Sequence, residues 1–329
     1  MAPRYDRSLS PGALKLLLPD GPLRFLVSDL PLYRDDPYAF DIQLRENNTL
    51  MYYRGTTRLL SVRIHENGDI RAVTQADKAY GRYPSSKEAY AGMMREWKLE
   101  EANEMAIAFH DYLLKSAEAC KNRYYGNRKE GYWQNRLCID WGLRWQTNQQ
   151  FMIIDRECVI GFDSEQEKRA FYDPLYRPYN EIRNQLQKEA CKIWGKAREK
   201  PFGDELDILA LDSQNNLVAI ELKHGCNPGG IYWGPLQVLA YRDAFKSKLA
   251  VVTRGIKKLV EQKVLLGLLP QTALSRLPDD AFPAVKTVLV IGDPNLKSKC
   301  WDNLNRVVKE LNVSKTDEDR DGLRLITLE

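Results

Sequence analysis

Two carboxylates and one ammonium in the second half of the chain have types and spacings that suit metal-assisted chemistry. Asp207 lies in one β-rich run, and Glu221 and Lys223 close the next run, fourteen and sixteen residues later. Carboxylate oxygens are the ligands that Mg²⁺ and Mn²⁺ prefer. A neighbouring ammonium can orient an attacking water or stabilise negative charge on a phosphate. These residues are therefore candidates for a cation site that acts on water or on a phosphate.

A β-hairpin is predicted to position these groups, with its turn at Asp212–Asn216. Side chains alternate between the two faces of a strand, so Glu221 and Lys223 share one face of the second strand. Asp207 joins them if the faces of the two strands coincide. The spacing permits this arrangement but does not fix it.

The ordinary alternative is that these charges lie on a solvated strand face, because an E-x-K triplet is common by chance. One observation opposes this alternative. Glu221 and Lys223 lie at the end of a nearly apolar run, Leu217–Leu222, and such a run is typical of a buried strand. Burying charged groups is costly unless they are paired or used. The context therefore favours a functional role.

The motif resembles the signature of the PD-(D/E)xK nuclease superfamily, with Asp207 followed by Glu221-Leu222-Lys223. Downstream, Gln237 and Tyr241 match the Q-x-x-x-Y helix of the RecB-type branch, and their spacing places them on one helix face. The resemblance covers roughly Tyr179–Thr253. It implies a restriction-endonuclease-like core with a central mixed sheet flanked by helices. It also implies that Asp207, Glu221, Lys223, Gln237 and Tyr241 are catalytic, with Mg²⁺ or Mn²⁺ bound by Asp207 and Glu221.

Members of this family usually have a further carboxylate on the helix before the first motif strand. Glu181 is the preferred candidate for a third metal ligand, and Glu189 is the alternative; an exposed helix glutamate is the ordinary reading of either. The sequence departs from the family pattern because no Pro-Asp pair is present. Glu205 is either an extra ligand or a surface charge.

Two neighbouring segments contain residues that suit nucleic acid. His224, Tyr232 and Trp233 lie in a Gly- and Pro-containing loop after the motif, where the histidine is read as structural or phosphate-contacting. The stretch Arg123–Trp145 interleaves cations with aromatic rings, as a nucleic-acid groove would. The favoured interpretation of that stretch is a pair of strands that bury their rings.

The pattern after Gly203 alternates strands and helices, which is typical of an α/β layer structure. Its expected elements include a helix over 235–245, strands over 249–253 and 285–291, a helix over 301–311 and a last strand over 323–328. A helix interrupted at Pro174 and Pro178 is expected over 164–196.

The first half is expected to form a separate α+β domain. It begins with an irregular segment up to about residue 22, followed by a small antiparallel sheet with a hairpin at Glu66–Asp69. A helix follows over 85–121, and two short strands over 151–154 and 159–162. The predicted division is therefore an N-terminal domain over 1–165, with no assigned role, and a nuclease-like domain over 166–329. A nucleotide-sensing role for the first domain stays open, although it contains no phosphate-binding loop.

Composition narrows the class of protein. The chain has 329 residues, 43% of them hydrophobic and 29% charged, and a net charge of +4, which permits a nucleic-acid partner without requiring one. Its six cysteines are scattered and its three histidines are far apart, so disulfides and zinc are not expected. Because no signal peptide or membrane span is visible, a cytoplasmic protein is expected.

Together these features predict a metal-dependent nuclease, with DNA favoured over RNA. The alternative class is a non-catalytic nucleic-acid-binding or interaction module on a nuclease-like fold. A homodimer is compatible with either class. The polarity of cutting and the preference for single or double strands stay open.

Overall fold

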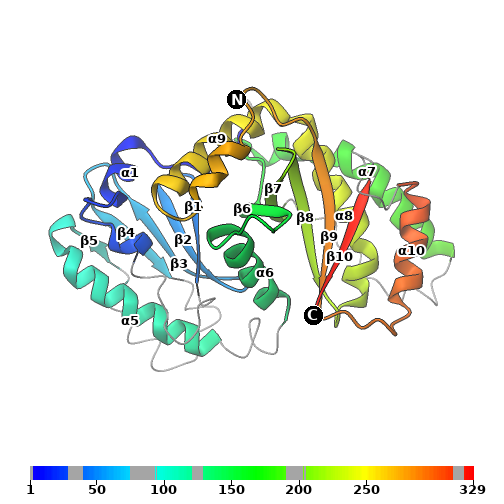
Figure 1. The fold of residues 1–329 in the computed structure, drawn as a ribbon, viewed down its shortest axis with the longest axis horizontal. Helices are drawn as coiled ribbons and strands as arrows, with labels where there is room; N and C mark the ends of the chain where they lie inside the picture. The colour runs from blue at the N-terminus through cyan, green and yellow to red at the C-terminus, as the bar shows by residue number, and fades with distance from the viewer. Residues whose placement is uncertain are drawn as a thin grey trace. The chain divides into compact units, whose positions relative to one another are not determined.

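Two β-sheets with packed helices make up the protein, which confirms the α/β class (Figure 1). One sheet is antiparallel and the other is mixed. The structure is a computed structural model that describes residues 3–28, 40–74, 93, 95–120, 129–189, 203, 205–313 and 322–329.

The chain forms two compact units that interleave in sequence. The first unit comprises Met1–Tyr5, Gln150–Arg254 and Arg276–Glu329, and the second comprises Asp6–Gln149 and Gly255–Ser275. This division differs from the predicted boundary near residue 165. The physical reason is strand β6 (Phe151–Cys158), which pairs with the motif strand β7 (Leu206–Asp212).

The second unit contains the antiparallel sheet, in the order β1-β2-β3-β4-β5. Its strands are β1 (Asp41–Arg45), β2 (Thr49–Arg54), β3 (Thr57–Ile64), β4 (Ile70–Thr74) and β5 (Glu96–Trp97). The predicted hairpin before Ile70 is confirmed, because it joins β3 to β4. Among the described residues up to 149, the helices of this unit are α1 (Pro11–Leu17), α2 (Phe25–Ser28), η1 (Leu99–Glu101), α5 (Ala102–Cys120), α6 (Glu130–Cys138) and the π-helix η3 (Ile139–Leu143).

Two expectations for this unit are wrong. The segment expected to be irregular contains α1, which begins with Pro11 and is capped by Ser10, whose side chain accepts a hydrogen bond from the Ala13 N–H. The described part of the aromatic stretch is helical, in α6 and η3, rather than a pair of strands. Trp133 and Leu137 are buried four residues apart, so helical periodicity decides the structure over the β-propensity of the rings. Residues 123–128 of that stretch lie outside the described residues. Residues 85–92, 94 and 121 of the expected helix over 85–121 also lie outside them.

The long helix α9 (Leu249–Leu265) returns the chain to the second unit, and the 3-10 helix η4 (Gln271–Arg276) follows it. Two consecutive buried residues of α9 bond to residues near the start of the unit. The Gln262 side-chain amide donates to the Leu9 carbonyl at 2.8 Å and accepts from the Leu9 N–H at 2.7 Å. The Lys263 ammonium donates to Gln43 Oε1 at 2.6 Å. These bonds join segments that are far apart in the sequence, one near its start and one in its last third.

The first unit contains the mixed sheet, in the order β10-β9-β8-β7-β6. β6, β7 and β8 (Leu217–His224) are antiparallel, whereas β9 (Val285–Gly292) and β10 (Leu323–Leu328) run parallel to β8. Helix α8 (Pro228–Ser247) packs on β8 and β9, and it in turn contacts α7 (Glu165–Glu189) and α10 (Cys300–Glu310) (Figure 1).

Three expectations for this unit need correction. Helix α7 continues through Pro174 and Pro178, and both prolines are exposed, so their rings lie outside the packed face of the helix. Residues 249–253 form the start of α9 instead of a strand, because Val252, Ile256 and Leu259 are buried at helical spacing. Residues 159–162 form no strand; within the described residues they make one isolated bridge, from Gly161 to Arg4. The elements expected near 285–291, 301–311 and 323–328 are confirmed.

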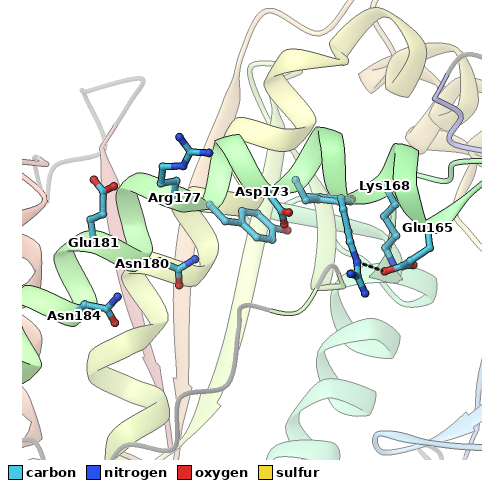
Figure 2. A pocket seen from close by; sticks show the side chains of 10 residues that line it. Glu165, Lys168, Asp173, Arg177, Asn180, Glu181 and Asn184 are labelled. Carbon is cyan, nitrogen blue, oxygen red and sulfur yellow. Dashed lines mark hydrogen bonds and ion pairs between the residues drawn. The ribbon is translucent and has the colours of Figure 1, made fainter.

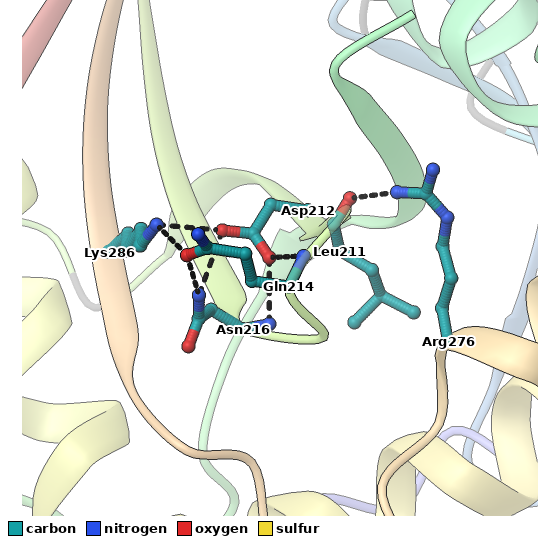
Figure 3. A network of polar contacts seen from close by, with 6 residues as sticks. All are labelled: Leu211, Asp212, Gln214, Asn216, Arg276 and Lys286. Carbon is teal, nitrogen blue, oxygen red and sulfur yellow. Dashed lines mark hydrogen bonds and ion pairs between the residues drawn. The ribbon is translucent and has the colours of Figure 1, made fainter. Parts of the chain in front are cut away.

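The turn between β7 and β8 is fixed by Asp212 (Figure 3). Its carboxylate accepts hydrogen bonds from the Gln214 N–H at 2.8 Å, from the Asn216 N–H at 2.9 Å and from the Asn216 side-chain amide at 2.9 Å. The Lys286 ammonium lies 3.0 Å from the same carboxylate. Burial alone would raise the pKa of Asp212, but the bonds from Asn216 and Lys286 outweigh it, and the pKa lies below its usual range. Because the turn sets the pairing of β7 with β8, this network also sets which residues face one another farther along the hairpin.

Substituting Asp212→Asn is expected to destabilise the protein at neutral pH by about 1–2 kcal/mol, because charge-assisted bonds are lost in a buried turn. A folded-state pKa below the unfolded value means that this contribution is complete above about pH 5 and is lost as the pH falls. Urea unfolding of the parent chain and of the Asp212→Asn variant should therefore give free energies of unfolding that differ clearly at pH 7 and little at pH 3. An equal difference at both pH values would contradict the assignment; Asp302→Asn, at an exposed site on α10, serves as the control.

Candidate active site

The register of the hairpin brings the motif residues to one face of the mixed sheet. Ile208 pairs with Ile220 and Leu209 with Ala219, so the next positions outward, Asp207 and Glu221, lie across from each other. Residues directly opposite in an antiparallel pair point to the same side. The faces of the two hairpin strands therefore coincide, which the sequence permitted but did not fix.

Lys223 bridges the two carboxylates. Its ammonium donates a hydrogen bond to Glu221 Oε1 and lies 3.7 Å from Asp207 Oδ2. Asp207 is held in turn by the Leu222 N–H, which donates to Oδ2 at 2.9 Å. The Glu221 side chain is 1% exposed and that of Lys223 is 9% exposed, whereas Asp207 is 27% exposed. The three groups thus form a buried charge cluster that reaches solvent at Asp207.

Helix α8 adds Gln237 and Tyr241 to this face of the sheet. The Gln237 side-chain amide donates to the Tyr241 hydroxyl at 3.4 Å. Burial of Tyr241 and the nearby charge of Glu221 raise the pKa of its phenol far above the ordinary value, and Asp207 and Glu205 add to this effect. The phenol therefore stays protonated at neutral pH and offers a hydrogen-bond donor beside the carboxylates.

Helix α7 contributes Tyr176, which the sequence analysis did not identify. Its ring meets that of Tyr241 edge to face, with centroids 6.3 Å apart. Burial raises the pKa of Tyr176, and the charges of Tyr172, Tyr241 and Glu221 raise it further. The signal in the sequence was the spacing of Tyr172, Tyr176 and Tyr179 at three and four residues, which indicates one buried helix face.

Glu181 does not join Asp207 and Glu221. It is exposed on α7, and among the described residues no group of three or more His, Cys, Asp and Glu side chains is arranged to hold a metal ion. The side chain of Glu189 is not among those described.

Strand β6 places a different carboxylate next to the motif. Arg156 pairs with Ile208 and Cys158 with Leu206, so Glu157 occupies the register position across from Asp207. Glu157 has a positive φ of 49°, and its carboxylate lies 3.7 Å from Arg156 Nη2. It was not considered from sequence, because β6 was assigned there to the other domain.

A pocket of about 630 Å³ runs along one face of α7 (Figure 2). Cationic side chains and two tyrosines line it together with carboxylates and amides, and they include Lys168, Arg169, Arg177, Tyr172, Tyr176 and Glu181. Residues that line the pocket recur every three or four positions, so one helical stripe presents all of them. Tyr176 belongs both to this pocket and to the ring contact with Tyr241.

The remaining nucleic-acid candidates are divided between the two units. Tyr232 is buried and Trp233 is half-buried, with ring centroids 5.1 Å apart in the first unit, so these rings pack on each other. In the second unit Trp133 is buried beneath Arg136, which lies 5.4 Å from its ring centroid. Both sets of rings therefore contribute to packing.

Comparisons with models of known families, with curated proteins and with solved structures found no match to this chain. In the part of the chain that the structure describes, no helix is long and apolar enough to cross a membrane.

Proposed function

We propose that this protein is a metal-dependent nuclease that hydrolyses phosphodiester bonds, with DNA favoured over RNA as the substrate. The observation that carries the proposal is the cluster of Asp207, Glu221 and Lys223 on one sheet face. Exposed ion pairs contribute little to stability, and buried ones often contribute none, so a buried cluster of this kind suggests chemistry rather than stabilisation.

The chemistry of the donors fits Mg²⁺ or Mn²⁺. Asp207 and Glu221 supply oxygen ligands only, and Mg²⁺ in enzymes of phosphate chemistry is often bound by one or two carboxylates, with water and substrate phosphates completing the shell. These two residues would hold the ion. When bound, such an ion lowers the pKa of water and offsets the negative charge of a phosphate.

The other groups have roles that depend on the chain alone. Lys223 keeps a positive charge within reach of both carboxylates, where it would stabilise negative charge that develops on the substrate. Tyr241, kept protonated by its raised pKa, would donate a hydrogen bond to a phosphate oxygen, with Gln237 orienting it.

The pocket along α7 supports a nucleic acid as the partner. Lys168, Arg169 and Arg177 suit contacts with phosphates, whereas Tyr172 and Tyr176 are buried beneath the pocket and support its wall. Acidic residues of the same stripe, among them Asp173, keep the lining from being strongly basic. Tyr176, which belongs to the wall of this pocket, also contacts Tyr241 of the candidate site.

The topology of the first unit supports a restriction-endonuclease-like core. β7 and β8 form an antiparallel hairpin, helix α8 follows, and β9 then joins parallel to β8. This gives a central mixed sheet with a helix carrying Gln237 and Tyr241 on it. Helix α7 precedes β7, where the resemblance implies a helix, and the pairing of β6 with β7 is the feature that the resemblance did not lead us to expect.

Labelled single-stranded and duplex DNA, incubated with the full chain and Mg²⁺ or Mn²⁺, should be cleaved, and EDTA should abolish the cleavage. Asp207→Asn and Glu221→Gln should each lower the rate by at least about 10²-fold, because each removes a charge from the site while preserving shape. Calorimetry with Mn²⁺ distinguishes a nuclease from a non-catalytic nucleic-acid-binding module. A protein that binds DNA but neither binds Mn²⁺ nor cleaves the DNA would be such a module.

A further inference from the structure

A second constellation of reactive side chains lies where two parallel strands end. His224 is the last residue of β8 and pairs with Gly292, the last residue of β9. Asp293 follows β9 directly, and Cys226 follows His224 after one glycine. The carboxyl ends of parallel strands are common places for functional sites in α/β folds.

The backbone holds these groups in close contact. A side chain at Gly225 would place its Cβ 1.9 Å from the Asp293 carbonyl oxygen, so only glycine fits there. The Gly225 N–H donates to the Gly292 carbonyl at 2.8 Å, and the Asn227 N–H donates to the His224 carbonyl at 2.8 Å. The turn is therefore packed directly against the segment that carries Asp293.

The hydrogen bonds define which ring nitrogen of His224 can accept a proton. The Cys226 N–H lies 3.1 Å from Nδ1, and because a backbone amide can only donate, Nδ1 carries the lone pair. The proton of the neutral ring is then on Nε2, which faces Asp293 Oδ2 at 3.6 Å. Cys226 Sγ lies 2.9 Å from Nδ1, so the thiol and the Cys226 N–H share the single lone pair of this nitrogen, and the thiol proton can take it over in a reaction. The imidazole of His224 thus lies between the carboxylate of Asp293 and the thiol of Cys226, as in enzymes whose nucleophile is activated by a neighbouring base.

Cys226 differs from the other described cysteines in its access to solvent. Cys138, Cys158 and Cys300 are buried, whereas Cys226 is exposed. It also directly precedes Asn227, the N-cap of the 20-residue helix α8.

We infer that Cys226 is a reactive thiol and a modification site for small hydroperoxides, with His224 as proton acceptor and Asp293 as the negative charge that stabilises the ring once it is protonated. The sulfur attacks one peroxide oxygen while the thiol proton passes to His224 Nδ1. The S–O bond forms, the O–O bond breaks, and the leaving oxygen takes the proton from His224. The sulfur is oxidised by two electrons to a sulfenic acid, and the hydroperoxide is reduced to water or an alcohol.

This reaction uses none of the groups proposed to cleave phosphodiesters, so it can be tested without a nuclease assay. The full chain is treated with hydrogen peroxide, sulfenic acid is trapped with a dione reagent, and the rate at each of the six cysteines is followed by peptide mass mapping. N-acetylcysteine in the same buffer gives the rate of a free thiol. Cys226 is expected to react at least about tenfold faster than that reference, as general base assistance would allow.

His224→Gln should return Cys226 to the rate of the free thiol, and Asp293→Asn should give an intermediate rate. Continued protection of Cys138, Cys158 and Cys300 in each variant shows that the fold is retained, because a urea-unfolded sample exposes every thiol equally. The inference is overturned if Cys226 in the native protein reacts no faster than N-acetylcysteine. It is equally overturned if a folded His224→Gln variant keeps the fast rate.

Discussion

Replacing Lys223 with methionine is expected to lower the rate of phosphodiester cleavage by about two to three orders of magnitude, the usual effect of removing one preorganised charge or donor from an active site. The ammonium lies 3.7 Å from Asp207 Oδ2 and donates to Glu221, so it is the positive charge closest to both carboxylates in the described contacts. Methionine keeps most of the volume and removes the charge. The loss should appear in kcat, measured on labelled DNA with saturating Mn²⁺.

The control for this substitution is Lys286→Met. Lys286 also belongs to the mixed sheet and also pairs with a buried aspartate, Asp212, but at the turn end of the hairpin (Figure 3). A loss of charge pairing alone would affect both variants, whereas a role in the reaction affects only Lys223. If Lys223→Met cleaved as fast as the parent chain above background, the assignment of the site would be wrong.

The largest loss of stability is expected from Asp155→Ala, at about 3–5 kcal/mol, because it removes a buried carboxylate and leaves its donors without it. Asp155 is fully buried in β6. It accepts a hydrogen bond from the Tyr5 hydroxyl at 2.6 Å and another from the Arg156 N–H at 2.8 Å. The loss is measured as a decrease in the free energy of unfolding in urea.

An exposed ion pair of the same unit provides the comparison. Glu165 and Arg169 lie one turn apart on α7, with an O–N distance of 3.2 Å and most of both side chains in water. Glu165→Ala should therefore change stability by no more than about 0.5 kcal/mol. A similar small effect for Asp155→Ala would show that the buried carboxylate does not hold the start of the chain to β6.

Local signals in the sequence were sufficient for the motif hairpin. The turn residues from Asp212 to Asn216 and the alternation in both strands predicted β7 and β8, and the observed pairing agrees. Strand parity limited the possible arrangements to two, and only the structure shows that Asp207 and Glu221 share a face. Register is set by the turn network and by pairing with β9, neither of which a single strand reveals.

Two elements were predicted wrongly because the types of a few side chains favoured one structure and the periodicity of buried residues favoured another. Residues 249–253 are largely β-branched and apolar, which favoured a strand, but they continue into a helix whose buried face extends to Lys263. Pro174 and Pro178 led to the prediction of an interrupted helix. Helix α7 is continuous, because both proline rings lie on its exposed side. In each case the packing of the whole element outweighs the preference of a few residues.

The parts of the candidate sites that come from distant segments could not be foreseen. Tyr176 and Tyr241 lie on different helices, and only the packing of α7 on α8 brings their rings together. Cys226 and Asp293 follow different strands, and only the pairing of β8 with β9 places them at the same edge of the sheet. Glu181 illustrates the reverse case, because a suitable residue type on the expected helix is exposed and does not join the carboxylates.

The bonds from Gln262 and Lys263 to Leu9 and Gln43 have a consequence for synthesis on the ribosome. Translation makes the early residues of the second unit first, yet their buried partners on α9 are made only after the motif strands have been synthesised. The five strands of the antiparallel sheet are thus made before α9, and the bonds to Leu9 and Gln43 form only after much of the mixed sheet's chain has emerged. The second unit therefore acquires all of its segments only after the ribosome has passed Ser275.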